Sequence, residues 1–143
     1  MPQQNPYENY GILQMLSDAN IPHYLSNMSQ AMEHAKMPEI YSRKLKEMYP
    51  DIGNRVDRGL LDMALNYASA YDYAARVPDP EIARQMARAY QYRDYGSRPE
   101  DTIQDYYENV AGINAFTGKR MSDEDLLKQA YEFARKKYET KQR

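Results

Sequence analysis

The sequence has no cysteine, no tryptophan, only two histidines and no long apolar run. Without cysteine the chain can form neither a disulfide framework nor a thiolate metal site, which excludes zinc fingers. No segment approaches the roughly 18 apolar residues that a membrane span requires, and the N-terminus lacks a basic region followed by an apolar run. We therefore expect neither a signal peptide nor a transmembrane segment.

A large excess of either charge is also absent. The 143 residues include 19 Lys and Arg against 21 Asp and Glu, for a net charge of −2. This balance gives no global electrostatic reason to expect a nucleic acid or an anionic membrane as partner. The charge is uneven along the chain, however, because residues 119–143 hold eight basic and five acidic residues (+3) and residues 1–118 hold 11 basic and 16 acidic residues (−5).

The alternation that marks β-strands is missing, whereas helical spacing is common. Leu60, Ala64, Tyr67, Tyr71 and Ala74 follow one another at intervals of four and three residues, which aligns them on one helix face. Proline and glycine divide the chain into short periodic segments. We predict a compact, single-domain all-α bundle of about five to seven helices over residues 1–143, with 119–143 as a candidate semi-independent C-terminal helix.

Several helix ends have local signals. Asp79 can cap a helix that has Pro80 at its first position, and Ser122 followed by Asp125 approximates a capping box. Shorter helices are expected near 7–18, 23–35 and 38–48, with a break at Pro38. Gly118 is expected to end the helix that follows residue 100 as a left-handed cap.

Tyrosine and methionine are abundant, with 15 and nine copies. A Tyr side chain buries a large ring while its hydroxyl reaches water or a carbonyl, so these residues suit a core or a protein interface. The last helix has an apolar face that could contact a partner or pack inside its own domain. Our predicted partner-binding residues are Leu126, Leu127, Phe133, Tyr138, Tyr92 and Tyr95.

Signatures of catalysis and cofactor binding are absent. His23 and His34 are too far apart in sequence to project together, and there is no glycine-rich phosphate loop. We therefore expect no catalytic residue, no cofactor, no metal site and no enzymatic activity. Arg84 and Arg88 are four residues apart and form a candidate anion site, although they could instead pair with nearby acids.

The most specific polar pattern is "RPEDTIQDYYENVAGIN". At 100° per residue Asp101, Asp105, Glu108 and Gly112 project within about 60° of one another, with Asn109 beside them. This face could bind a divalent cation or perform acid–base chemistry, or it could be a solvated acidic surface. A glycine within a helix costs about 1 kcal/mol relative to alanine, so Gly112 suggests close approach of another backbone or a ligand.

These residues also carry a resemblance. "DYYENVAG", followed by "SDEDLL", resembles the Asp-x-x-Asn-Asn-x-x-Gly signature and downstream "SDEEL" helix of a helical domain found in bacterial polymorphic-toxin-like proteins and phage genomes. Asp105, Asn109 and Gly112 match the signature, and Glu108 replaces its first Asn. The family's Arg-His pair would fall within 66–70, which reads "NYASA" here. The resemblance implies a phage or mobile-element setting and a non-catalytic relative.

Three functional hypotheses follow. The first is a non-enzymatic interaction or assembly component, such as a small phage virion protein, that binds a protein partner or other copies of itself. The second is a phage-encoded inhibitor that mimics nucleic acid through its acidic portion. The third is a small enzyme or divalent-metal-binding domain that uses the acidic helix face. The first predicts a cytoplasmic or virion-associated location.

Overall fold

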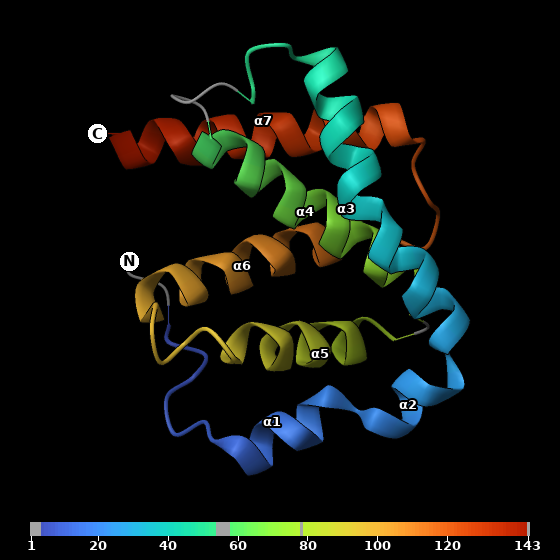
Figure 1. Cartoon of the computed structure of the whole chain (residues 1–143), viewed down its shortest axis with the longest axis vertical. Coiled ribbons are helices and arrows are strands. Elements are labelled where there is room, and N and C mark those ends of the chain that lie inside the picture. Colours follow the sequence, from blue (N-terminus) through green and yellow to red (C-terminus); the bar gives the residue numbers. More distant parts are fainter. Residues whose placement is uncertain (1–3, 54–57, 78, 143) are drawn as a thin grey trace.

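A computed structural model describes residues 4–53, 58–77 and 79–142. This part of the chain forms α-helices joined by turns and contains no strand, which confirms the predicted all-α bundle (Figure 1). The helices are α1 (Ile12–Ala19), α2 (Ile21–Ser26), α3 (Met28–Met48), α4 (Arg58–Arg76), α5 (Pro80–Tyr92), α6 (Pro99–Ala115) and α7 (Asp123–Gln142).

Helix α4 lies at the centre of the bundle. It packs against α3 and α7 on one side and α6 on another, while α6 lies between α4 and α5, and α5 lies between α6 and α1 (Figure 1). The predicted stripe of α4 is buried as expected. With α3 and α7 it forms the main core, whose fully buried side chains include Tyr41, Leu45, Ala64, Ala68, Tyr71, Leu126, Leu127, Ala130 and Ala134.

The contact between α4 and α6 depends on Gly112. A Cβ atom at this position would lie 2.1 Å from the carbonyl oxygen of Tyr67 and 2.9 Å from its carbonyl carbon. Only glycine lets the two backbones approach this closely. The mid-helix glycine is therefore explained by another backbone, one of the two explanations that the sequence allowed.

Local capping signals predicted two helix starts correctly. The Asp79 side chain accepts a hydrogen bond from the Glu81 amide at 2.9 Å, and α5 begins with Pro80. The Ser122 hydroxyl accepts from the Asp125 amide at 3.1 Å, and α7 begins one residue later. Both bonds satisfy backbone donors that the first helical turn leaves without an intrahelical partner.

Two predicted breaks are wrong. Helix α3 continues through Pro38, although proline in a helix interior costs about 3 kcal/mol. The buried side chains of Tyr41 and Leu45 hold the second half of α3 on α4 and α7 and so offset this cost. Gly118 does have a positive φ of 102°, but α6 has already ended at Ala115 with Phe116 as an extended cap.

Helix α7 packs along α4 and contributes to the main core. Its semi-independence from the rest of the domain stays a prediction, which truncation before residue 119 would test.

Candidate functional site

A large cleft lies beside α4, α5 and α6. Its volume is about 1160 Å³, and α1, α2 and α3 complete its border. Along α4 the lining runs from Gly59 to Tyr73, which corresponds to roughly 21 Å of helix. Such a cleft is larger than most small-molecule pockets, which span roughly 300–1,000 Å³.

One end of the cleft is acidic. We define the acidic wall as Asp62 of α4 together with Asp101, Asp105 and Glu108 of α6. Asn66 of α4 joins the two helices, because its amide nitrogen donates to Glu108 Oε1 at 2.9 Å and lies 3.3 Å from Asp105 Oδ1. The structure thus brings four of the five residues of the predicted polar face to the cleft, Asn109 included, and adds Asp62 and Asn66.

The electrostatics of the acidic wall centre on Asp105. Burial and then the carboxylates of Asp101 and Asp62 raise the pKa of Asp105, while Arg98 and the Asn66 hydrogen bond act in the opposite direction. The Arg98 guanidinium is more than half exposed and lies 3.8 Å from Asp105 Oδ2, so it neutralises the wall only in part. A cationic group entering this end would favour the ionised form of Asp105.

The fifth predicted residue, Gly112, contacts the α4 backbone and has no side chain to contribute. Among the described residues, no group of three or more His, Asp or Glu side chains is placed to hold a metal ion. Glu108 is buried and hydrogen-bonded to Asn66. The negative charge that the acidic wall presents to the cleft therefore comes from the exposed Asp62 and Asp101 and the half-buried Asp105.

The other end of the cleft is rich in tyrosine and methionine. We define the Tyr-Met wall as Met15 of α1, Tyr24 of α2, Tyr73 of α4, and Met86 and Tyr90 of α5. Tyr73 and Met86 contact each other through a 3.0 Å hydroxyl–sulfur bond, whereas Tyr90 is 59% exposed. This wall can bury apolar groups of a ligand and adapt its shape, because methionine side chains are flexible.

A buried ionic cluster lies behind the cleft. Asp72 of α4 is fully buried, with Arg76 Nε at 2.9 Å and His34 Nδ1 at 2.8 Å from its Oδ2 atom. Arg120, which precedes α7, binds the other carboxylate oxygen and also reaches the Tyr41 hydroxyl. Burial alone would raise the pKa of Asp72, but hydrogen bonds from His34, Arg76 and Arg120 lower it to about 2.

This cluster was not predicted from the sequence, in which His34 has no recognisable partner. The only local signal is the spacing of Asp72 and Arg76, which are four residues apart on one helix. Because its members come from α3, α4 and the α6–α7 connection, the cluster joins three segments of the chain and is structural.

The candidate anion site is occupied by the chain's own acids. Arg88 binds Asp18 of α1, with Nε and one terminal nitrogen 2.9 and 2.8 Å from Oδ2. Arg84 binds Glu81 at 3.0 Å and donates to Asn114 at 3.0 Å. The alternative that these arginines pair with nearby acids is therefore what the structure contains.

The six predicted partner-binding residues also have neighbours within the fold. Leu126 and Leu127 are buried in the main core and cannot form a partner surface in this fold, because α7 directs them at α4. Phe133 and Tyr138 pack against the same core and are half-buried. Tyr92 and Tyr95 belong to a ring cluster with Tyr7, Tyr10 and Tyr106, which ties the N-terminal residues to α5 and α6.

A different surface is apolar and exposed. We define the α1–α3 apolar face by its eight large apolar residues, which are between 42% and 85% exposed. They are Ile12, Leu13, Leu16, Ile21, Tyr24, Leu25, Met28 and Met32. The sequence analysis did not identify this face, although one signal was present: between residues 9 and 32 the only Asp, Glu, Lys or Arg is Asp18, in a chain that is 28% charged.

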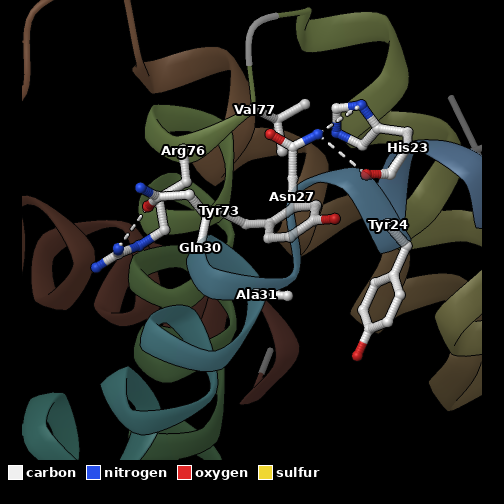
Figure 2. Close-up of a pocket in the computed structure, with 8 residues that line it drawn as sticks. All are labelled: His23, Tyr24, Asn27, Gln30, Ala31, Tyr73, Arg76 and Val77. Atoms are coloured by element: carbon white, nitrogen blue, oxygen red, sulfur yellow. Dashed lines mark hydrogen bonds between the residues drawn. The ribbon is translucent and has the colours of Figure 1, made fainter.

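A much smaller pocket of about 10 Å³ lies at the junction of α2, α3 and α4 (Figure 2). The Asn27 amide donates to the His23 carbonyl at 3.0 Å, and Arg76 donates to Gln30 at 3.0 Å. This space is large enough for about one water molecule and too small for a ligand.

Comparison with known proteins gave no match to a family model, a curated protein or a solved structure. No helix within the described ranges has the combination of length and apolar composition needed to cross a membrane.

Proposed function

We propose that the protein is a non-enzymatic interaction or assembly component that binds a basic, amphipathic segment of a partner protein in its cleft. The observation that supports this proposal is the pairing, in one 1160 Å³ cleft, of an acidic wall with a Tyr-Met wall. A ligand that satisfies both walls needs cationic side chains at one end and apolar side chains at the other.

The size of the cleft favours a peptide segment over a small molecule. The α4 residues of the two walls lie roughly 16 Å apart along the helix axis, a length that about three helical turns of a partner would span. Aromatic and methionine side chains are enriched at protein interfaces, and charge complementarity gives such contacts their specificity. The acidic wall would select Lys or Arg, and the Tyr-Met wall would bury the partner's apolar face.

A synthetic peptide tests this function. The probe is a helical peptide of about four turns with Leu along one face and Lys in the first two turns, and the control peptide has Glu in place of Lys. Binding is measured by fluorescence anisotropy and located by NMR chemical-shift changes. We expect the Lys peptide to bind at least tenfold more tightly than the Glu peptide, with shifts confined to the cleft residues.

Two matched variants separate the cleft from general acidity. Asp105→Asn should weaken binding of the Lys peptide severalfold, whereas Glu124→Gln on α7 removes an exposed charge outside the cleft and should leave it unchanged. Tyr90→Ala should weaken binding without altering its salt dependence. Equal effects of Asp105→Asn and Glu124→Gln would show non-specific attraction and contradict the proposal.

The pH dependence gives a further check. The protonated form of Asp105 cannot attract a cation, and its pKa is raised. Affinity for the Lys peptide should therefore increase as the pH rises through this pKa, and Asp105→Asn should remove that increase. The divalent-metal alternative predicts a different result. It would be favoured if Ca²⁺ or Mg²⁺ bound with a dissociation constant below about 1 mM and if Asp105→Asn abolished that binding.

A further inference from the structure

Helix α1 is oriented opposite to an ordinary amphipathic helix. Its one buried residue is Asp18, while Ile12, Leu13 and Leu16 project away from the bundle and Leu13 is 85% exposed. The Asp18 carboxylate accepts hydrogen bonds from the Tyr10 hydroxyl at 2.8 Å and from Arg88. An ion pair thus attaches α1 to α5, and the apolar side of α1 is exposed to solvent.

The α1–α3 apolar face has the size of a protein interface. Because a large side chain presents on the order of 200 Å² when fully exposed, its eight residues expose on the order of 900 Å². A typical stable interface buries about 800 Å² on each partner, and the largest apolar patch of an ordinary monomer is about 300–600 Å². The summed exposed area of these eight side chains is therefore comparable to one side of a stable interface.

The charge pattern indicates which partner fits. The segment 9–32 has no exposed Asp, Glu, Lys or Arg, because its single carboxylate is buried against Arg88. A membrane-surface helix normally has Lys and Arg beside its apolar face, and these are absent here. An uncharged apolar face can meet an identical copy of itself around a twofold axis without any like-charge contact.

We propose that the α1–α3 apolar face is the interface of a homodimer. This interface goes beyond the cleft-binding function: it borders the cleft at Ile21 and Tyr24, but the other six residues of the face do not line the cleft. The association is driven by apolar burial, so it does not weaken as the salt concentration rises. That behaviour distinguishes it from pairing through the acidic and basic parts of the chain, which salt would weaken.

Sedimentation velocity on the full chain tests the proposal over about a hundredfold range of concentration, at low and high salt. We expect a reversible monomer–dimer equilibrium with equal or tighter association at high salt. Leu13→Glu should raise the dimer dissociation constant at least tenfold with an unchanged circular dichroism spectrum, because the side chain contacts solvent. Tyr90→Glu places the same change at an exposed apolar residue outside the face and should have no effect on the dimer.

A wild-type chain that stays monomeric throughout this range would overturn the proposal, as would a dimer that Leu13→Glu leaves intact. If Leu13→Glu unfolds, Met32→Glu on α3, 62% exposed, provides the same test. Flotation with neutral phosphatidylcholine vesicles tests whether the face binds a lipid surface instead. If the wild type forms no dimer and binds these vesicles, and Leu13→Glu does not bind them, the face is a lipid-binding surface and the dimer proposal is wrong.

Discussion

Replacing Asp72 by Asn tests whether the buried ionic cluster stabilises the fold. The substitution keeps the size of the side chain but removes its charge, and it turns one hydrogen-bond acceptor toward His34, Arg76 or Arg120 into a donor. Removing one member of a buried ion pair typically costs about 3–5 kcal/mol. Because Arg120 is partly exposed and can regain water, we expect the low end, about 3 kcal/mol at neutral pH.

The pKa of Asp72 gives an independent magnitude. Its folded-state value of about 2 lies below the ordinary 3.8, and each pKa unit corresponds to about 1.4 kcal/mol. The ionised carboxylate therefore contributes about 2 kcal/mol to the free energy of unfolding. Because folding lowers this pKa, the contribution is complete above about pH 4 and disappears as the pH falls toward 2.

Urea denaturation followed by circular dichroism at pH 7 and near pH 2 measures both effects. Asp72→Asn should lower the free energy of unfolding by about 3 kcal/mol at pH 7, which corresponds to a melting temperature on the order of 10 °C lower. Near pH 2 the difference in free energy of unfolding between Asp72→Asn and the wild type should be smaller by about 2 kcal/mol. Asp62→Asn, the same change at an exposed position of α4, should stay within about 0.5 kcal/mol of the wild type.

A loss below about 1 kcal/mol at pH 7, or a difference that does not vary with pH, would refute this account of Asp72.

Two other substitutions test how helices are held together. Gly112→Ala should destabilise the protein by about 1–3 kcal/mol in thermal unfolding, because the new methyl group overlaps the Tyr67 carbonyl, while Gly96→Ala has open space and should be nearly neutral. Asp18→Asn should weaken the attachment of α1, because it leaves Arg88 without its buried acid. Hydrogen exchange should then show reduced protection of the α1 amides with little change in α4. Equal loss of protection in both helices would contradict this prediction.

The helices were predictable from sequence where their signals are local. The Asp79–Pro80 start of α5 and the Ser122 cap of α7 each act within one helical turn, so neighbouring residues are sufficient to identify them. Pro38 is different, because its tolerance depends on packing of the following turn against α4 and α7. The periodicity of residues 60–74 predicted a buried face but could not identify the helices that cover it.

The candidate site was predictable only where its residues lie on one helix. The acidic face of α6 follows from spacing within one helix, and Gly112 correctly indicated a close approach. The cleft itself required tertiary structure, because Asp62 and Asn66 meet this face from another helix about 40 residues away in sequence. The ionic cluster was missed because Asp72 and Arg120 are 48 residues apart.

The attachment of α1 connects stability with assembly. Ile12, Leu13 and Leu16 lie exposed on α1, and each would contribute roughly 1.5–3 kcal/mol if it became fully buried. The pair of Asp18 and Arg88 contributes less than this to stability, since the cost of removing both charges from water offsets much of their attraction. In the proposed dimer the three apolar side chains would be buried at the interface while the Asp18–Arg88 ion pair is kept. The outward orientation of the apolar side of α1 is what the proposed dimer requires.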